Sequence, residues 1–297
     1  MDEVRVEIEG RQLTLSNLDK ILYPDGPLTK AGVVDYYARI APVMIPHLAG
    51  RAATLVRAPD GPEGQRFFEK RCPPSAPDWV RSGGKLGSCI VDDAPTLVWL
   101  ANLAALELHT HQHLVAAPDE PRAVVFDLDP GPPAGVLDCA RTALDLRALL
   151  DRLGLTAYVK TSGSKGLHLS VPLNGADPDI TDDTTKGFAL AIGRVLAEAG
   201  PDRVTVTMAK NLRPGKVFVD WSQNDDNKTT VAVYSLRIRP QPTVSAPVTW
   251  DEVSDALDAD DEDSLTFGTD AVLERASALG DLYAGNVTDQ QLLPKLA

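Results

Sequence analysis

An apolar run that ends in two aspartates is the feature that most constrains how this chain can fold. Residues 123–126 (AVVF) predict a buried strand, and the Pro-Gly pair at 130–131 ends it. Side chains two apart on a strand share a face, so Asp127 and Asp129 would lie about 6 to 7 Å apart on one side. Like charges this close repel each other unless a cation lies between them, and oxygen ligands suit Mg²⁺ or Mn²⁺. The pair predicts either a metal site or a solvated corner with two exposed acids.

The remaining apolar pattern predicts a mixture of helices and strands. Helices are expected over residues 16–22, 29–44 (ended by the proline at 46), 96–108, 136–153 and 184–199. Strands are expected as a pair within residues 4–15 and over 157–160, 167–172, 204–207, 217–221 and 231–234. The last 50 or so residues are expected to be mainly helical and acidic. The strand-helix-strand order between residues 123 and 172 indicates an α/β or α+β fold, with mixed β-sheets flanked by helices.

The net charge of −13 argues at first against a nucleic-acid partner. The charge is unevenly spread, however, because residues 251–263 contain eight acids and no base. Residues 51–85 contain seven bases against four acids. Local basic surface matters more for phosphate binding than the total charge does.

Cysteine usage and hydropathy point to a protein of the cytoplasm. The three cysteines, Cys72, Cys89 and Cys139, form no CxxC motif, and we expect them to be reduced packing residues. No apolar stretch approaches the length of a membrane span, so no membrane partner is expected, and the first residues lack a signal-peptide pattern. No repeat or linker divides the 297 residues, which predicts a single domain over residues 1–297.

A second group of candidate residues lies in the segment 161–168 (TSGSKGLH), between two predicted strands. Glycines there allow close approach of the backbone to an anion, hydroxyls and amides can donate to it, and Lys165 adds a positive charge. The segment is not a Walker motif, because Lys165 and Gly166 lead into a strand rather than a helix. The alternatives are an ordinary Gly-Ser turn and a structural role for His168.

A third carboxylate, Asp220, ends the predicted strand 217–221. Its setting matches that of the first two aspartates, which suggests that the three converge. A surface aspartate at a strand exit is the alternative. Four cations follow or precede it at Lys210, Arg213, Lys228 and Arg237, and a metal-bound triphosphate would require such charges.

Two further patterns leave their alternatives open. His109, His111 and His113 lie at the end of a predicted helix, but this spacing favours no particular metal and no cysteine completes a zinc site. Phe67 and Phe68 lie in a basic segment, where they would either pack in the core or stack on a base.

Six motifs in order give the chain a specific resemblance. They are residues 18–24 (LDKILYP), 67–70 (FFEK), 126–130 (FDLDP), 161–168, 217–224 (VFVDWSQN) and 228–237. On these motifs the chain resembles the archaeo-eukaryotic primase superfamily. More closely, it resembles the polymerase domain of bacterial ligase D, the end-joining repair enzyme, and its stand-alone actinobacterial relatives. The resemblance implies a primase-like catalytic core over about residues 14–247, followed by an acidic helical segment over about 248–297.

The resemblance implies roles for individual residues of this sequence, carried over by position. The metal-binding and catalytic triad would be Asp127, Asp129 and Asp220, holding two divalent ions, Mn²⁺ or Mg²⁺. The incoming nucleoside triphosphate would be held by His109, Ser162, Lys165, Gly166, His168 and Arg237. A downstream 5′-phosphate would be bound by Asn17, Lys20 and Lys30. Phe67 and Phe68 would stack against the template. Weaker candidates for support of DNA or of the site are Arg57, Arg213 and Gln223.

The activity that the resemblance implies is template-directed primer extension and short-gap filling, by two-metal nucleotidyl transfer with a preference for ribonucleotides. Its substrates would be NTP or dNTP and gapped or broken duplex DNA with a 5′-phosphate. A separate DNA ligase and an end-binding protein are expected as partners, because no ligase or phosphoesterase segment is evident. The stretch of residues 81–88 looks shorter than in the ligase-fused domains, which favours gap filling over the bridging of two DNA ends.

Two other classes of function are the alternatives. One is a phosphohydrolase of the haloacid dehalogenase type with Asp127 as nucleophile, although Pro130 stands where that pattern normally has Thr or Val. The other is a non-catalytic protein that binds DNA ends through Lys20 and Lys30. The retention of all three aspartates argues against it.

Overall fold

Segments distant in sequence combine into two compact units in the computed structural model, which describes residues 3–295. Unit 1 comprises Met1–His111, Val231–Ser245 and Gly268–Asp281. Unit 2 comprises Gln112–Thr230, Ala246–Phe267 and Leu282–Ala297. The single domain expected over residues 1–297, with its core at about 14–247, stays a prediction.

Unit 2 is built on a six-stranded sheet in the order β15-β16-β12-β14-β13-β18. Its strands are β12 (Ala123–Pro130), β13 (Tyr158–Thr161), β14 (Leu167–Pro172), β15 (Val204–Thr205), β16 (Val217–Asp220) and β18 (Pro247–Val248). The central strand β12 is antiparallel to both β14 and β16. A separate hairpin is formed by β10 (His113–Leu114) and β11 (Ala117–Pro121).

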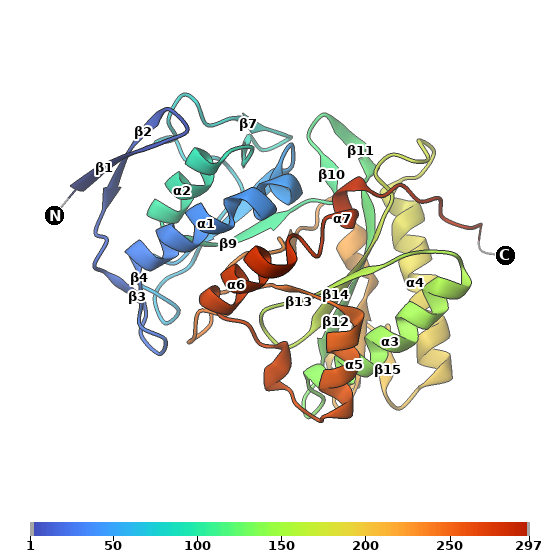
Figure 1. Cartoon of the computed structure of the whole chain (residues 1–297). Coiled ribbons are helices and arrows are strands. Elements are labelled where there is room, and N and C mark those ends of the chain that lie inside the picture. The colour runs from blue at the N-terminus through green and yellow to red at the C-terminus, as the bar shows by residue number, and fades with distance from the viewer. Residues whose placement is uncertain (1–2, 296–297) are drawn as a thin grey trace. The chain divides into compact units, whose positions relative to one another are not determined.

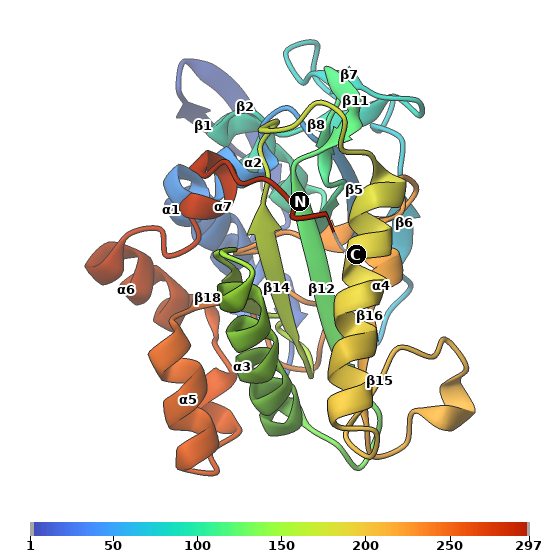
Figure 2. The ribbon, with the colours of Figure 1, turned by 90° about the vertical axis from the view of Figure 1, so that its right-hand side faces the viewer.

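Two long helices cover one face of this sheet, α3 (Val136–Arg152) and α4 (Asp182–Ala199), as Figure 2 shows. Their buried residues form one hydrophobic core with Val124, Phe126 and Leu128 of β12. Because successive side chains of a strand alternate between faces, Asp127 and Asp129 lie on the other face of the sheet. The helices of this unit therefore decide which side of β12 carries the carboxylates.

Shorter elements complete unit 2. They are η1 (Lys210–Leu212), η2 (Trp221–Asn224), α5 (Trp250–Asp258), η3 (Asp263–Leu265) and α7 (Gly285–Thr288). α5 packs against α3. It begins with a capping box in which Thr249 accepts from the Glu252 N–H while the Glu252 carboxylate accepts from the Thr249 N–H. The acidic run of residues 251–263 thus forms α5 and the turn after it, as expected.

Unit 1 contains a second sheet, in which β9-β5-β8-β7 are neighbours and β6 also pairs with β5. The strands are β5 (Ala52–Arg57), β6 (Phe67–Glu69), β7 (Ser82–Gly83), β8 (Ser88–Ile90) and β9 (Ala105–Thr110). β17 (Thr230–Val231) is the strand of this sheet next to β9. Three helices and two hairpin pairs accompany the sheet: α1 (Lys30–Leu48), α2 (Ala94–Asn102), α6 (Thr269–Leu279), β1 (Glu3–Ile8) with β2 (Arg11–Ser16), and β3 (Ile21–Tyr23) with β4 (Leu28–Thr29). Figure 1 labels most of these elements.

The mixed α/β fold class is confirmed, but four expected elements are wrong in part. The strand expected over residues 231–234 is limited to β17 (Thr230–Val231), and residues 233–234 form a turn. The helix expected over residues 16–22 is a turn, with Asn17 at φ 54°, followed by β3. The apolar stretch 96–108 is split, because α2 ends at Asn102 and β9 begins at Ala105. A wholly apolar stretch fits a buried helix or a buried strand equally well, so periodicity could not separate them. α1 also continues past Pro46 to Leu48, with Met44 and Leu48 buried in the core.

The expectation that all cysteines are reduced is wrong for two of them. Cys72 and Cys89 form a disulfide with a Cα–Cα distance of 4.6 Å. The backbone N–H of Cys72 donates to the carbonyl oxygen of Gly87 at 2.8 Å, so backbone pairing brings the two cysteines together. A separation of 17 residues matches no metal or redox motif, so the bridge could not be predicted from the spacing of the cysteines. Cys139 is buried and free, as expected.

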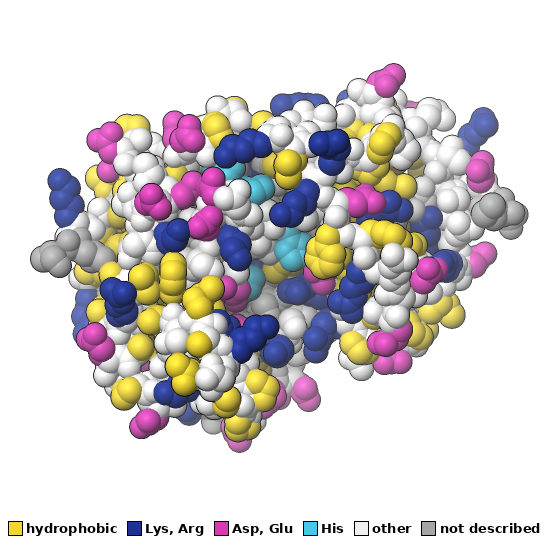
Figure 3. Space-filling view, turned by 180° about the vertical axis from the view of Figure 1, so that it is seen from behind, with side chains coloured by type: hydrophobic (Ala, Val, Ile, Leu, Met, Phe, Trp, Pro, Cys, Tyr) yellow, Lys and Arg dark blue, Asp and Glu magenta, His cyan; other side chains and the backbone are white. Residues whose placement is uncertain are grey.

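Two surface properties bear on function. Lys and Arg side chains, dark blue in Figure 3, are numerous on the face seen there despite the net charge of −13. Within residues 3–295, none of the helices has both the length and the apolar character needed to span a bilayer.

Candidate active site

The three aspartates lie on neighbouring strands of unit 2. Asp127 on β12 is directly opposite Asp220 on β16, and Asp129 is opposite Phe218. Residues directly opposite each other on antiparallel strands project from the same face. All three carboxylates therefore lie on the face of the sheet away from α3 and α4, as the sequence predicted.

Two further side chains, on β14 and β13, lie in line with Asp220 and Asp127 across the sheet. His168 on β14 is opposite Asp127, and Lys160 on β13 is opposite His168. His168 Nε2 lies 3.3 Å from Asp127 Oδ1, and Lys160 Nζ lies 3.1 Å from His168 Nδ1. An ammonium group can only donate, so Nδ1 accepts and Nε2 carries the hydrogen directed at Asp127. The buried Lys160, which sequence reasoning missed, thus orients the histidine that contacts the metal-ligand candidate Asp127.

Electrostatic crowding shows in the pKa of Asp129. Partial burial raises this pKa above its ordinary value, and the charges of Asp127 and Asp220 raise it further. The positive charges of Lys165 and Arg213 act in the opposite direction. Since a raised pKa means that the carboxylate is costly to ionise here, a bound cation would relieve the repulsion.

The donor set suits a divalent cation, since three carboxylates are the oxygen ligands that Mg²⁺ and Mn²⁺ prefer. Within the described residues, however, no three His, Cys, Asp or Glu side chains are already gathered as metal ligands. Asp220 Oδ1 accepts from the N–H and hydroxyl of Ser222 at 3.0 and 2.6 Å, and its Oδ2 accepts from Gln223 Nε2 at 2.9 Å. The residue types and their strand positions fit the metal, while the carboxylates of Asp127 and Asp220 are directed at protein donors.

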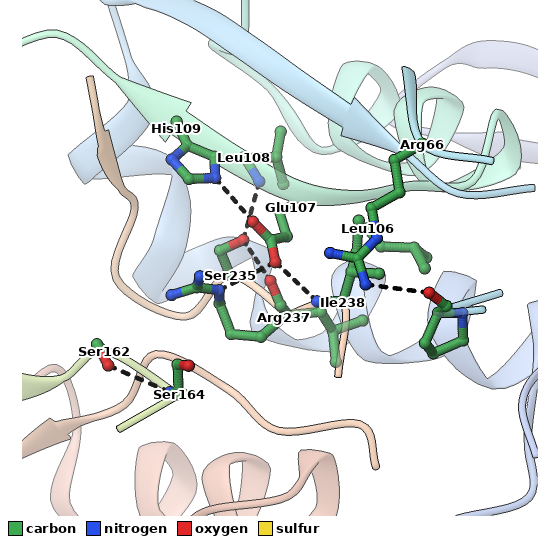
Figure 4. Close-up of polar contacts among 12 residues, drawn as sticks. Arg66, Leu106, Glu107, Leu108, His109, Ser162, Ser164, Ser235, Arg237 and Ile238 are labelled. Atoms are coloured by element: carbon green, nitrogen blue, oxygen red, sulfur yellow. Dashed lines mark hydrogen bonds and ion pairs between the residues drawn. The ribbon is translucent and has the colours of Figure 1, made fainter. Parts of the chain in front are cut away.

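The turn between β13 and β14 places Lys165 beside this row. Ser162 Oγ accepts from the N–H groups of Ser164 and Gly166 at 3.2 and 3.1 Å, which closes the turn on itself; Figure 4 draws the first of these bonds. A Cβ on Gly166 would lie 2.0 Å from the carbonyl oxygen of Leu128, so the turn packs tightly on β12. Lys165 is exposed, and its charge acts on Asp129. Four predicted nucleotide contacts, Ser162, Lys165, Gly166 and His168, are thus brought together near Asp127 and Asp129.

Arg213 and Gln223, the weaker candidates of this unit, lie close to the aspartates. The Arg213 guanidinium donates to the carbonyl oxygens of Thr207 and Met208 at 3.2 and 2.6 Å and stacks 3.5 Å from the ring centre of Phe218. Gln223 donates to Asp220. Both residues are therefore held by the protein around the candidate metal ligands.

Asn224 is a supporting residue that sequence reasoning missed. Its side-chain oxygen accepts from the Val125 N–H at 2.8 Å, and its amide nitrogen donates to the Val125 carbonyl oxygen at 2.7 Å. Asn224 is 2% exposed, and this paired contact fastens η2 to β12. Because η2 directly follows Asp220, the contact helps to fix that aspartate opposite Asp127.

Unit 1 holds the other two predicted nucleotide contacts, His109 and Arg237. His109 lies on β9, so the expectation that it lies at a helix end is wrong. Both side chains contact the carboxylate of Glu107, which Figure 4 shows between them. His109 Nε2 is 2.9 Å from Glu107 Oε2, and Arg237 Nε donates to Glu107 Oε1 at 3.1 Å. Glu107 was not singled out from the sequence.

The candidate 5′-phosphate residues gather at the first turn of α1. The N–H of Lys30 donates to the carbonyl oxygen of Lys20 at 2.8 Å, and the N–H of Lys20 donates to that of Asn17 at 3.1 Å. Burial lowers the pKa of Lys30, and the nearby charge of Lys20 lowers it further. Lys20 is held by Asp60 at 2.7 Å. Two cations at a helix N-terminus favour a bound anion.

The aromatic pair lies at the surface of unit 1. Phe67 and Phe68, on β6, are 39% and 72% exposed, so core packing does not explain them. Arg57 is opposite Phe67 on β5 and donates to Glu69 Oε1 and to the carbonyl oxygen of Leu103, both at 2.8 Å. Exposed aromatic rings beside cations are typical of surfaces that stack on nucleic-acid bases.

Comparisons with known proteins agree with these observations. The sequence model of the family described as LigD, primase-polymerase domain, matches residues 29–283. The multifunctional non-homologous end joining protein LigD of Mycolicibacterium smegmatis is 44% identical over an alignment of 293 residues that covers 96% of this chain and 37% of that protein. The bifunctional non-homologous end joining protein LigD of Bacillus subtilis is 33% identical over 272 residues, 91% of this chain and 43% of that protein. The chain thus spans less than half the length of these relatives.

A solved structure gives the same result at the level of the fold. The polymerase domain from Mycobacterium tuberculosis ligase D in complex with DNA is similar with a TM-score of 0.84 and 41% sequence identity, over 94% of this chain and 99% of that one. The matched range of residues 29–283 includes the three aspartates, the turn at residues 162–166, and Glu107 with its contacts. The resemblance inferred from six sequence motifs is confirmed, and the chain belongs to the LigD primase-polymerase family.

Proposed function

We propose that this chain extends a primer strand by template-directed nucleotidyl transfer and fills short gaps in duplex DNA that carries a 5′-phosphate. The observation that carries the proposal is the placement of three aspartates on one face of β12 and β16, beside the turn with Lys165. Membership of the primase-polymerase family makes the chain a nucleotidyltransferase. A similar polymerase domain has been solved with DNA, which supports DNA as the substrate here.

Asp127, Asp129 and Asp220 would hold two divalent ions, Mn²⁺ or Mg²⁺. Bound there, the ions would supply a lowered pKa for the primer 3′-hydroxyl and stabilisation of the leaving pyrophosphate. His168 would keep the Asp127 carboxylate in place through its Nε2–H, since Lys160 occupies its other ring nitrogen. Ser222 and Gln223 would orient Asp220 in the same way.

The turn at residues 162–166 would bind the triphosphate of the incoming nucleotide. Lys165 is exposed next to Asp129 and would neutralise negative charge on the phosphates. Ser162 and Gly166 would keep the turn closed and close to β12. His109 and Arg237 would add the further nucleotide contacts that family membership suggests.

DNA contacts would come from unit 1. Asn17, Lys20 and Lys30 would bind the 5′-phosphate at the start of α1, and Phe67 and Phe68 would stack on the template strand. A preference for ribonucleotides, a role in end joining, and cooperation with a DNA ligase and an end-binding protein belong to the same proposal. The names of the relatives support the end-joining role.

The test is primer extension on a short 5′-phosphorylated gap with Mn²⁺ and either ribonucleotides or deoxynucleotides. Asp129→Ala should reduce extension by more than about a hundredfold, because it removes a metal ligand candidate. Binding of the gapped DNA should stay within about twofold of wild type, since the 5′-phosphate contacts are intact. Lys20→Ala combined with Lys30→Met should give the reverse pattern, with weaker gap binding and a functional metal site.

Asp151→Ala provides a matched control, because Asp151 is a carboxylate of α3 that forms an ion pair with Arg147. It should extend primers like wild type. Wild-type extension rates in Asp129→Ala would overturn the metal assignment. The phosphohydrolase alternative is excluded by family membership. The non-catalytic end-binding alternative would be supported by gap binding without extension in wild type.

A further inference from the structure

A buried carboxylate in unit 1, Glu107, holds both nucleotide-contact candidates of that unit. The residue is 7% exposed on β9. Its Oε2 lies 2.9 Å from His109 Nε2, and its Oε1 accepts from Arg237 Nε at 3.1 Å and from the Ile238 N–H at 2.7 Å (Figure 4). The side chains of His109 and Arg237 are 20% and 18% exposed, against 10% for Glu107. The carboxylate therefore lies deeper than the two groups that it holds.

We infer that Glu107 is a positioning residue, which sets the ring orientation of His109 and the guanidinium orientation of Arg237 for the incoming nucleotide. The inference rests on the proposed function, because it concerns how two predicted nucleotide contacts are held. Glu107 itself does not contact the nucleotide. It acts only through the two side chains bonded to it.

The charge of Glu107 is what makes it suitable for this role. Burial by itself raises the pKa of a carboxyl group, but the hydrogen bond with His109, the charge of Arg237 and the Ile238 N–H lower the pKa of Glu107 to about 2. Glu107 is therefore ionised at any working pH and acts only as an acceptor. As an acceptor it requires a hydrogen on Nε2 of His109, which fixes the tautomer of a neutral imidazole ring.

Glu107 also joins two parts of the chain that are far apart in sequence. Arg237 and Ile238 lie 130 and 131 residues from Glu107. Next to them, Ser235 Oγ accepts from the Leu108 N–H at 2.9 Å, and Tyr37 donates to the Leu106 carbonyl oxygen and accepts from the Leu236 N–H. Ser235 and Tyr37 align the segment on β9, and Glu107 contacts His109 and Arg237 as well as the backbone N–H of Ile238.

The test compares Glu107→Gln with Ser235→Ala. The glutamine keeps the shape and can still accept from Ile238, but it removes the charge and one of the two acceptor oxygens. We expect KM for the nucleotide to rise about tenfold. A loss of this size is found when groups that orient metal-ligating side chains are removed. Binding of 5′-phosphorylated gapped DNA without nucleotide should not change. Ser235→Ala removes a neighbouring bond of the same segment, so it should lower the melting temperature and leave KM within about twofold.

A spectroscopic readout separates this inference from the proposed function. Nitrogen NMR of the imidazole in the wild-type protein, with His109→Gln for assignment, should show His109 with its hydrogen on Nε2. Glu107→Gln should shift that ring toward a mixture of tautomers. A His109 ring without a hydrogen on Nε2 in wild type, or an unchanged KM in Glu107→Gln, would overturn the inference. Wild-type protein that fails to extend primers would overturn the proposed function alone. If Glu107→Gln does not fold, the wild-type spectrum and Glu107→Asp decide the matter.

Discussion

Lys160 is buried next to the buried His168, and these two residues determine how the carboxylate of Asp127 is held. The ammonium group of Lys160 donates to Nδ1 of His168, so the ring hydrogen of His168 is on Nε2. That nitrogen faces Asp127. A buried cation is costly unless it is paired, so its presence at 4% exposure indicates a specific role. That role is to keep the histidine directed at the carboxylate.

Lys160→Met should therefore loosen the contact between His168 and Asp127, while the size and apolar stem of the side chain at position 160 are kept. His168 Nδ1 loses its donor, and a buried group left without its partner costs about 1 to 3 kcal/mol of stability. We expect a lower melting temperature and primer extension reduced by about tenfold. Lys186→Met, which removes an α4 lysine paired with Asp225 at the surface, should change both by little. Equal effects of the two substitutions would contradict the role assigned to Lys160.

Glu107 gives a prediction about acid stability. Its folded pKa of about 2 lies below the ordinary value of 4.5. A depressed acid pKa stabilises the folded state above the unfolded pKa, and this stabilisation is lost as the pH falls from about 4.5 toward 2. The difference corresponds to about 3 kcal/mol for this buried group. Urea unfolding should show wild type to be more stable than Glu107→Gln at pH 7, with a gap that narrows below pH 4.5. A gap independent of pH would show that charge is not the cause.

Some residues of the candidate site could be predicted from the sequence, and others could not. Asp127, Asp129 and Asp220 could be predicted because each ends an apolar strand, and strand alternation then assigns the face. Glu107 could not, because its partner Arg237 is 130 residues away and an acid on a strand carries no local sign of a distant donor. Lys160 and Asn224 were missed for the same reason, since their partners lie on other strands.

At the scale of elements, β12 limits where the turn with Lys165 can lie, because this turn precedes β14 and packs directly on β12. Gly166 is the point of closest approach, since a Cβ there would lie 2.0 Å from the Leu128 carbonyl oxygen. Only a glycine allows the two backbones to come so near. The position of Lys165 therefore depends on this glycine as much as on its own side chain.

Gly166→Ala should push the turn away from β12. We expect a loss of stability of about 1 to 3 kcal/mol, as for other overpacked sites, together with weaker nucleotide binding. Gly187→Ala is the matched control, because a Cβ there meets nothing within 4 Å on the surface of α4. In a helix that change should stabilise the protein by about 0.5 to 1 kcal/mol. Thermal unfolding measures both effects, and a neutral Gly166→Ala would contradict the packing argument.

Elements were predictable where their pattern had a clear period. α3 and α4 have one apolar face each and were expected within two residues of their bounds. The apolar stretch that became α2 and β9 has no such period, so the break at Leu103 and Ala104 was not foreseen. The register that places Asp220 opposite Asp127 is a pairing of strands about 90 residues apart, which no local pattern encodes.

For the whole molecule, total charge is a poor guide to function. Eight of the 42 acids lie in residues 251–263, on α5 and the turn after it, and none of the candidate site residues is among them. The bases of residues 51–85 lie on or next to β5, β6 and β7 of unit 1. Arg57 lies on β5, and the exposed Phe67 and Phe68 lie on β6. The net charge of −13 is thus compatible with a local surface that binds DNA.

The Cys72–Cys89 disulfide makes the stability of the whole chain depend on redox conditions. The bridge closes a segment with a sequence separation of 17, and a loop of that length contributes about 3 kcal/mol. A reductant should therefore lower the melting temperature of wild type by several degrees. The double variant with Cys72→Ser and Cys89→Ser should melt at the reduced value with or without reductant. Thiol titration of the unfolded wild type should detect only Cys139 before reduction. Three reactive thiols in protein that was never reduced, or a melting temperature indifferent to reductant, would show that the bridge does not stabilise the fold.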